Sequence, residues 1–427
     1  MKQRISRCVL ATMAVVVWMH HPAARAACPN SPRDAFEQYM SRFEAAKRVS
    51  DYSACEACLK QALAVRVTDY AAGSLVWAQM NQNKTEEALK SANMMLNAVG
   101  RTPYAVASFL DASLREGVLD KIEDAIDYAQ RAHLGDGADW TNSYLRDMVE
   151  KARHIHTPAV YELRWTIPGK EFTTERPTRR FGFPLLHTPV QTFSYKLTGA
   201  VADRVVVAND DKTVVDITGE PGKPVLVEGT ATITPQYIGA RELRRLTTET
   251  TASSVPDEVG IFYYWLEPFD PATPSIRPVV QAVKRNNAVE TLQAILTWRS
   301  KEMPYAKLPD GAGSTLDRIM KFHCGVCHHA SYMSASLARA CGIPAIVMGG
   351  DCLPDKAGEF TNADTSHGWI SVKLPSRGWT EFESLDPNSL YAFRGDNYLR
   401  FARQGAKDEG GDRISLQGYK ISGRRIQ

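Results

Sequence analysis

The chain is poor in net charge and in long apolar runs. Its 427 residues include 51 Lys and Arg against 48 Asp and Glu, which gives a formal net charge of +3. A nucleic-acid-binding surface gathers a larger excess of positive charge on one face, so we interpret clusters such as Arg179-Arg180 as solvated surface. Beyond Met19 no apolar run is long enough to span a bilayer, which argues against a later membrane anchor.

The N-terminus has the pattern of a secretory signal peptide. Basic residues precede an apolar run from Cys8 to Met19, and Ala24-Arg25-Ala26 is a small-x-small cleavage site. We therefore predict cleavage near Ala26 or Ala27 and a periplasmic or secreted protein. An uncleaved anchor is the alternative, although the run is short for a membrane span.

Cysteines are few, and their number is odd once the signal peptide is removed. The mature chain keeps Cys28, Cys55, Cys58, Cys324, Cys327, Cys341 and Cys352. Such a count in an exported protein is typical of one free thiol and up to three disulfides. Cys28 could join Cys55 or Cys58, and the other three could brace the region around Cys327. We favour a structural role for Cys55 and Cys58 over a redox pair, because no thioredoxin-like strand precedes them.

The most informative segment begins at Cys327. Apolar residues recur at helical spacing from Ala330 to Cys341, Gly342 stands where a helix stops, and Pro344 follows it. Cys327 is therefore predicted to lie in or just before the first turn of this helix. Unpaired backbone N–H groups and the positive end of the helix dipole favour a thiolate there, so we expect a lowered pKa for this cysteine.

A histidine follows on a predicted strand. His367 begins a run through Leu374 in which apolar and polar residues alternate, as in a half-buried strand. An imidazole beside the thiolate could carry the proton that an amine leaving group needs. After a turn at residues 375–378 the chain resumes as a return strand, which could bring Glu383 or Asp386 beside the histidine. Either carboxylate could orient the imidazole, as in a catalytic triad.

Four landmarks in this order resemble the transglutaminase-like superfamily: Gly325-Val326-Cys327, Arg339 with Gly342-Ile343-Pro344-Ala345, His367-Gly368-Trp369, and Gly378-Trp379. The resemblance covers about residues 265–400 and implies a papain-like core that carries Cys, His and Asp in that order. It implies Cys327 as the nucleophile and His367 as its proton carrier. The family's aspartate, counted four residues after the strand tryptophan, falls on Glu383, and Asp386 lies three residues further on. This chemistry requires no metal and no organic cofactor.

Other interpretations use the same residues. Cys324-Gly325-Val326-Cys327-His328 fits the C-x-x-C-H pattern of covalent haem attachment, which would make His328 an axial ligand. A zinc site could use Cys324, Cys327, His328 and His329, although these ligands are closer together than is usual. The haem interpretation accounts neither for the helix after Cys327 nor for the later histidine. A packed cysteine in a catalytically inactive segment is the remaining alternative.

The chain as a whole is predicted to be α+β. Helical spacing dominates residues 31–155, where Lys84 to Leu89 recurs thirty-seven residues later, which is typical of tetratricopeptide-like hairpins; a plain helical bundle is the alternative. From residue 156 alternation between turn signals predicts a β-sandwich-like domain, followed by the papain-like core. We divide the chain into a signal peptide (1–27), a helical repeat-like domain (28–155), a β-rich domain (156–255), a transglutaminase-like catalytic domain (256–405) and a loosely ordered C-terminal tail (406–427).

Together these features predict an exported thiol enzyme that acts on amide or peptide bonds through a Cys327 thioester. We favour hydrolysis because the resemblance is to the broad bacterial group; a cross-linking transglutaminase and an inactive scaffold or binding protein are the alternatives. The expected partner is a protein or peptide substrate, with a further protein partner on the helical region and no nucleic acid. The sequence leaves open the substrate, the disulfide pairing, the oligomeric state and the third member of the triad.

Overall fold

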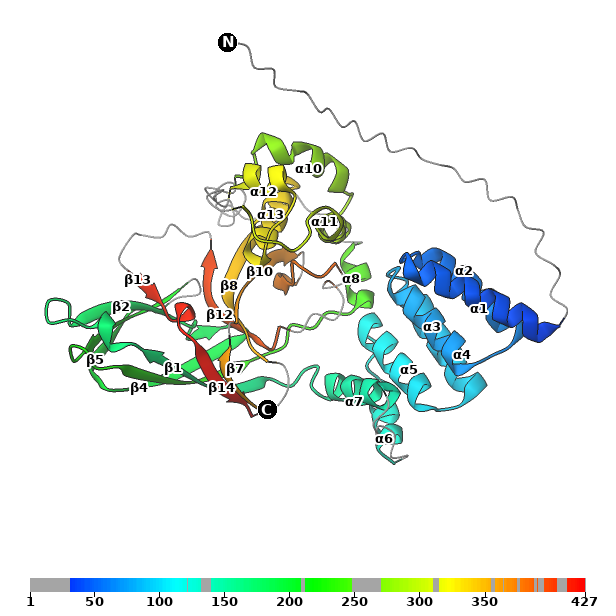
Figure 1. The fold of residues 1–427 in the computed structure, drawn as a ribbon, viewed down its shortest axis with the longest axis horizontal. Helices are drawn as coiled ribbons and strands as arrows, with labels where there is room; N and C mark the ends of the chain where they lie inside the picture. The colour runs from blue at the N-terminus through cyan, green and yellow to red at the C-terminus, as the bar shows by residue number, and fades with distance from the viewer. Residues whose placement is uncertain are drawn as a thin grey trace, which may run out of the picture.

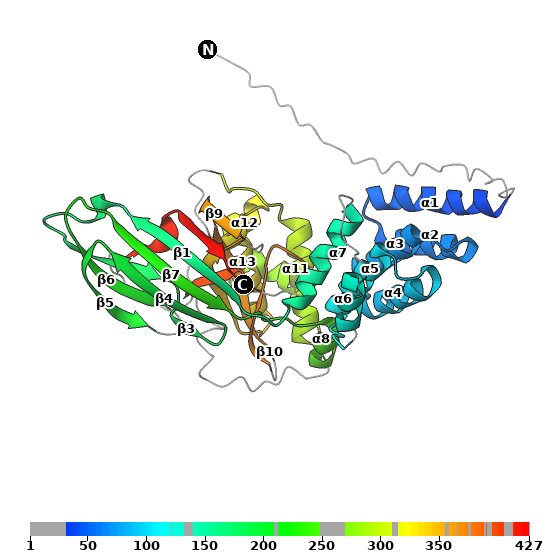
Figure 2. The same ribbon diagram turned by 90° about the horizontal axis from the view of Figure 1, so that it is seen from below.

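The structure, a computed structural model, has three regions arranged in a row. Figure 2 shows a β-sandwich at one end, a helix-covered sheet in the middle and the N-terminal helices at the other end. The structure describes residues 31–426 except for 121, 132–139, 209–211, 248–269, 310–314, 355–357, 364, 375–376, 388–389, 391–394 and 405–412. The predicted signal peptide lies outside the described residues. No helix in the described ranges combines the length and apolar character needed to cross a membrane.

The N-terminal region consists of helices that pack on one another (Figure 1). They are α1 (Pro32–Arg48), α2 (Tyr52–Val65), α3 (Asp69–Met80), α4 (Thr85–Val99), α5 (Pro103–Glu116), α6 (Ile122–Arg131) and α7 (Trp140–Arg153). Helices α1 to α5 each pack on the next in sequence, and α7 packs on α5. The side chains of Ser31, Asp51, Thr68 and Thr102 cap four of them by accepting a backbone N–H bond. These polar caps explain why the helices begin where they do.

The internal sequence repeat falls on two equivalent helix starts. Its first copy opens α4 and its second opens α6, and the small residues at the matching offset, Ala92 and Ala129, are both buried. A small side chain at this place lets a neighbouring helix approach closely. The helical nature of the region is confirmed, whereas its assignment to the tetratricopeptide type stays a prediction.

Strands from residues 159–233 and three strands from later in the chain form two sheets packed face to face. Strand order is β3-β4-β7-β1-β14-β9 in one and β13-β2-β6-β5 in the other. The strands are β1 (Ala159–Ile167), β2 (Thr178–Phe183), β3 (His187–Thr188), β4 (Gln191–Thr198), β5 (Ala200–Ala208), β6 (Thr213–Gly219), β7 (Val225–Ile233), β9 (Gly358–Ala363), β13 (Arg413–Ser415) and β14 (Ile421–Arg425), with 3₁₀ turns η1 (Gly169–Glu171) and η4 (Leu416–Gly418). Every second residue of β1 is buried in a core shared with the facing sheet, as the alternation predicted.

The C-terminal segment is part of this sandwich. The expectation of a loosely ordered tail is wrong for residues 413–425, because β14 pairs antiparallel with both β1 and β9, and β13 pairs with β2. The strand was missed because it is short and carries Gly and Arg, so its sequence has no apolar alternation. It is held by backbone ladders and by the burial of Ile421.

Helix α8 (Ala240–Thr247) lies in the segment that was assigned to the β-rich domain, and it joins the helical region to the central sheet. Leu243 and Leu246 enter the core of the central region, while Arg244 pairs with Glu116 of α5. The amphipathic spacing of the two leucines explains why this segment is a helix.

The central region is a sheet of order β11-β10-β8-β12 covered by helices. The elements are η3 (Pro274–Ile276), α10 (Arg277–Val283), α11 (Ala288–Glu302), α12 (Leu316–Phe322), α13 (Cys327–Ala340), β8 (Ala345–Cys352), β10 (Ser366–Leu374), β11 (Gly378–Phe382) and β12 (Tyr398–Gln404). Ile370, Val372 and Leu374 pack with the helices, whereas Trp369 belongs to a separate cluster with Tyr398. The predicted alternation of β10 is therefore confirmed, and its two faces bury different cores.

Candidate active site

Cys327 is the first residue of helix α13. The helix begins where predicted, and His329 helps to start it, since its Nδ1 accepts the backbone N–H of Val326 at 3.2 Å. At the other end Gly342 has φ +89°, a conformation that favours glycine, and Ile343 N–H bonds to the carbonyl of Ala338 as in a Schellman motif. The helix is thereby fixed at both ends with the Cys327 thiol at its positive pole.

His367 lies beside this helix start on β10. Strand and helix approach so closely that a Cβ on Gly368 would stand 3.2 Å from the Cα of His328, so a side chain at position 368 would push them apart. Cys327 hydrogen-bonds to the imidazole of His367, and the backbone N–H of Gly368 also points to the sulfur. The structure therefore brings the two residues together through a glycine contact.

Glu383 is the carboxylate that reaches the histidine. Its Oε2 lies 2.6 Å from Nε2 of His367, which leaves Nδ1 of the ring for the sulfur. Its other oxygen, Oε1, accepts the backbone N–H of Leu385 at 2.8 Å. The order is thus thiol, imidazole, carboxylate, with each group in contact with the next, which is the arrangement of a catalytic triad.

Asp386 takes a different position. Its side chain is exposed, and its charge acts on Arg299, a buried residue that donates a hydrogen bond to the carbonyl of Leu385. Burial lowers the pKa of Arg299, while Glu383 and Asp386 raise it. Of the two carboxylates left open by the sequence, Glu383 is the one in contact with His367.

The charges of the site favour an ion pair near neutral pH. Burial alone raises the pKa of the Cys327 thiol, but hydrogen bonds from His328 and His367 and the charge of His367 outweigh it and lower that pKa to about 6. Burial lowers the pKa of His367, but its contacts with Cys327 and Glu383 raise it to about 9. Between these values sulfur is a thiolate and imidazole an imidazolium.

A buried ion pair between Arg400 and Glu381 lies next to the triad, and it was not predicted from the sequence. Arg400 of β12 is fully buried and binds both oxygens of Glu381 at 2.8 Å, and Glu381 also accepts the indole N–H of Trp369 at 2.7 Å. The Trp369 ring in turn stacks against His367. Arg400 falls within the predicted catalytic domain, but it was given no role there. An arginine amid apolar strand residues was the available signal.

Of the residues in the haem and zinc interpretations, Cys327, His328 and His329 lie together at the helix start, whereas the sulfur of Cys324 is directed elsewhere. Cys324 directs its sulfur towards the carbonyl of Lys307 at 3.9 Å, Cys327 contacts His367, and His329 caps the helix. Burial lowers the pKa of His329 to about 4, so it is neutral and can accept its hydrogen bond. Over the residues that the structure describes, no cluster of three or more His, Cys, Asp or Glu has the geometry of a metal site.

The six described cysteines, Cys55, Cys58, Cys324, Cys327, Cys341 and Cys352, form no disulfide bond with one another. The predicted bracing of the site by disulfides among Cys324, Cys341 and Cys352 is therefore not found. Cys28 lies outside the described residues.

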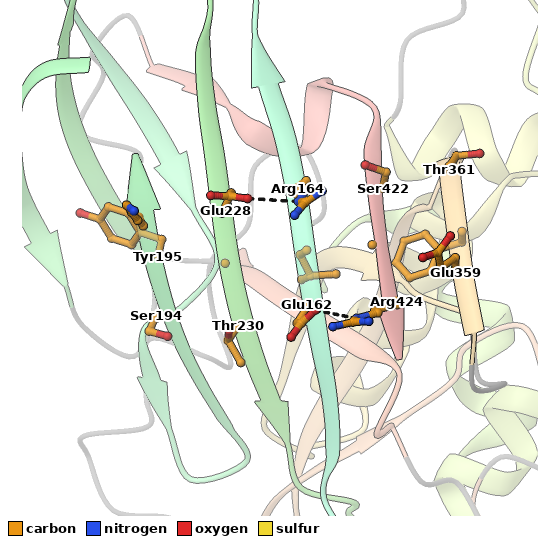
Figure 3. Close-up of a pocket in the computed structure, with 15 residues that line it drawn as sticks. Glu162, Arg164, Ser194, Tyr195, Glu228, Thr230, Glu359, Thr361, Ser422 and Arg424 are labelled. Carbon is orange, nitrogen blue, oxygen red and sulfur yellow. Dashed lines mark hydrogen bonds and ion pairs between the residues drawn. The ribbon is translucent and has the colours of Figure 1, made fainter. Parts of the chain in front are cut away.

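A separate hollow of about 690 Å³ lies on the outer face of the six-stranded sheet (Figure 3). Two ion pairs cross it, Arg164 with Glu228 at 3.2 Å and Arg424 with Glu162 at 2.6 Å. The hollow contains none of the triad residues. It is therefore distinct from the candidate active site.

A family model matches the part of the chain that carries Cys327, His367 and Glu383. Residues 277–384 match the family model of the transglutaminase-like superfamily, and no curated protein matches the chain significantly. Among solved structures, the chain is similar to a candidate cysteine protease from Cytophaga hutchinsonii, with 14% identity, a TM-score of 0.45, and coverage of 64% of this chain and 92% of that one. It is also similar to the periplasmic domain of TgpA from Pseudomonas aeruginosa, with 16% identity, a TM-score of 0.25, and coverage of 59% and 90%. Residues 277–384 of this chain thus form a domain of the transglutaminase-like superfamily.

Proposed function

We propose that the protein is an exported thiol hydrolase that cleaves amide or peptide bonds through a thioester on Cys327. The observation that carries the proposal is the continuous contact from Cys327 through His367 to Glu383, at a helix start that favours a thiolate. Cys327 is only 9% exposed, so a substrate carbonyl must enter a confined site to reach it.

The first half of the reaction forms the thioester. The Cys327 thiolate attacks the carbonyl carbon, and the oxyanion that develops is stabilised by backbone N–H groups at the start of α13. The C–N bond then breaks while the imidazolium of His367 gives its Nδ1 proton to the departing amine. Glu383 stays ionised and holds the ring through Nε2, so that Nδ1 faces the sulfur throughout.

The second half releases the acyl group. His367, now neutral, takes a proton from water as the water oxygen attacks the thioester carbon, and the C–S bond breaks to return the thiolate and a carboxylic acid. An amine in place of water would give a new amide, which is the cross-linking alternative. We favour water because the family match is to the superfamily core and not to a cross-linking subgroup.

Location and partners are proposed on the sequence and on the fold. The basic and apolar N-terminus supports export to the periplasm or beyond. The helices α1–α7 leave a hollow of about 580 Å³ lined by Phe43, Tyr70, Trp77, Tyr104 and Tyr144, which supports a role in contacting a protein substrate or partner.

The test traps the thioester. Purified mature protein is incubated with casein and, separately, with the dipeptide benzyloxycarbonyl-Gln-Gly in the presence of hydroxylamine, and new amino termini and hydroxamate are measured. We expect Cys327-dependent hydrolysis, with Cys341→Ala as the control that removes another thiol of the same helix. Amine incorporation in excess of hydrolysis would favour the cross-linking alternative. Turnover by Cys327→Ala equal to that of the wild type would contradict the proposal.

A further inference from the structure

We infer that Tyr398 is a positioning residue for the proposed acyl transfer, holding Glu383 in the orientation that keeps His367 against Cys327. The inference rests on the proposed function, since it concerns the same three groups. Its basis is a hydrogen bond of 2.6 Å in which the phenol O–H of Tyr398 donates to Oε2 of Glu383.

Tyr398 donates its hydrogen bond to the carboxylate oxygen of Glu383 that also contacts His367. Oε2 is also the atom that faces Nε2 of His367, at the same distance of 2.6 Å, while Oε1 accepts the backbone N–H of Leu385. Three donors therefore surround one carboxylate, and the plane of the carboxylate is fixed. Removing the phenol would take away one of the contacts that oppose rotation about the last side-chain bond of Glu383.

A glutamate needs this restraint more than an aspartate would. The resemblance to the family places an aspartate at the third position, and this chain has Glu383 there, with one more methylene group and one more rotatable bond. A longer side chain loses more rotamer freedom when it is held in a single geometry. Tyr398 supplies the additional contact that compensates for this freedom.

Tyr398 is itself rigidly placed. It starts β12, at the opposite edge of the central sheet from β11, after which Glu383 follows, and its ring packs edge-on against Trp369 with centroids 4.8 Å apart. Its carbonyl accepts a hydrogen bond of 2.7 Å from Arg400, whose guanidinium reaches across the sheet to Glu381. The buried ion pair thus fixes the distance between the strand that bears the phenol and the carboxylate that receives its hydrogen bond.

The phenol acts as a donor and not as a proton source. Burial and the nearby charge of Glu383 raise the pKa of Tyr398 far above its usual value, so the O–H stays intact at any pH at which the enzyme could work. The same causes include Cys352, which lies close to the hydroxyl, so the experiment must separate that thiol from Glu383.

The experiment compares Tyr398→Phe with the wild type in the full mature chain. The rate of Cys327 alkylation by iodoacetamide is followed by peptide-resolved mass spectrometry at pH values on both sides of each pKa, and casein hydrolysis is measured in parallel. Tyr144→Phe is the matched control, because Tyr144 also donates to a carboxylate, Asp111, at 2.8 Å, but in the helical region. Cys352→Ser is the control for the neighbouring thiol.

If Tyr398 positions Glu383, removing its hydroxyl should narrow the pH interval in which Cys327 is a thiolate and His367 is an imidazolium. In Tyr398→Phe we expect the Cys327 pKa to rise and the His367 pKa to fall, each by about one pH unit, with kcat about tenfold lower and KM unchanged. Tyr144→Phe and Cys352→Ser should behave as the wild type. A carboxylate that merely became more basic would widen the interval instead. A wider or unchanged interval in Tyr398→Phe would overturn the inference and leave the proposed function intact.

A double-mutant cycle with Glu383→Gln decides whether the effect passes through the carboxylate. If Tyr398 acts through Glu383, adding Tyr398→Phe to Glu383→Gln costs nothing further, whereas additive losses overturn the inference. Tyr398→Met replaces Tyr398→Phe if the latter fails to fold by near-ultraviolet circular dichroism. A lowered Cys327 pKa in a wild type without hydrolysis would refute the proposed function alone; an ordinary Cys327 pKa would refute both.

Discussion

The two ends of helix α13 each carry a cysteine, and the two thiols are shifted in opposite directions. Cys327 opens the helix and has its pKa lowered to about 6, whereas Cys341 follows the last residue and has its pKa raised by burial. Cys327 is nevertheless the more buried of the two. Exposure therefore does not decide the direction in which the pKa of each thiol is shifted.

The difference comes from what each helix end offers a negative charge. The N-terminal end has unpaired N–H groups, and the imidazole of His367 stands beside it. At the C-terminal end the carbonyl groups point outwards, and the Schellman motif at Gly342 uses the local N–H groups to satisfy them. A thiolate is stabilised at the first end and disfavoured at the second.

Replacing each of the two thiols in turn should give the largest expected difference in hydrolysis rate. Cys327→Ala should lower amide hydrolysis by at least about 1,000-fold, because the nucleophile is lost. Cys341→Ala should keep wild-type hydrolysis. Both are measured as the initial rate of casein cleavage. A comparable loss in the two variants would mean that the helix ends do not differ as described.

Breaking the buried Arg400–Glu381 ion pair near the start of α13 should destabilise the fold. Arg400→Met leaves Glu381 buried without its cation, which should lower the free energy of unfolding by about 3–5 kcal/mol in urea titration. Arg180→Met is the control, because Arg180 makes a similar two-point contact with Asp216 at the surface. We expect no resolvable change for that variant. Equal effects of the two substitutions would argue that burial of the pair is irrelevant.

Removing the imidazole should make the two thiols alike. In His367→Ala the Cys327 pKa should return towards about 8.5, so its alkylation rate at pH 7 should fall about 30-fold as the thiolate fraction falls. The rate at Cys341 should not change. Peptide-resolved alkylation measures both sites in one sample. A retained fast rate at Cys327 would assign the lowered pKa to the helix end and the hydrogen bond from His328, without His367.

In the wild type, lowering the pH should reversibly protonate the Cys327 thiolate and remove its higher reactivity relative to Cys341. The Cys327 pKa lies below its ordinary value, so the thiolate is present above about 6 and is lost as the pH falls through that value. Between pH 7 and pH 5 the alkylation rate should drop about tenfold. Turnover should decline again above about 9, where His367 loses its proton. A flat profile between pH 5 and pH 7 would be inconsistent with the ion pair.

The smallest expected effect is at the C-terminal end. Gly342→Ala places a side chain at φ +89°, where nothing within 4 Å obstructs it, so only backbone strain opposes the change. We expect about 1 kcal/mol lower stability in thermal unfolding and an unchanged alkylation rate at Cys327. A change in Cys327 reactivity would show that the two ends are coupled.

Local patterns made the helix that begins at Cys327 and the strand that carries His367 predictable. The apolar spacing after Cys327, the glycine stop at Gly342 and the alternation after His367 are properties of short stretches, and the structure places each element there. The choice between Glu383 and Asp386 was not local. It depends on how a return strand ends, and a difference of three residues decides which carboxylate meets the imidazole.

Residues that act from a distance in sequence could not be predicted. Tyr398 and Arg400 follow Glu383 and Glu381 by 15 and 19 residues, and they lie on a strand at the far edge of the sheet. The C-terminal strand β14 pairs with β1, which begins at Ala159, and no pattern within the five residues of β14 predicts this pairing.

The sequence by itself determined the helical N-terminal region, the alternating strands of the β-rich domain, the place of Cys327 at the start of its helix and the superfamily that the core resembles. These follow from periodicity, capping residues and motif order, which act over a few residues. Only the tertiary structure decided which carboxylate orients His367, which buried groups support the site and where the chain's end is held. Those choices depend on contacts between strands distant in sequence, whose pairing is set by the packing of the whole sheet.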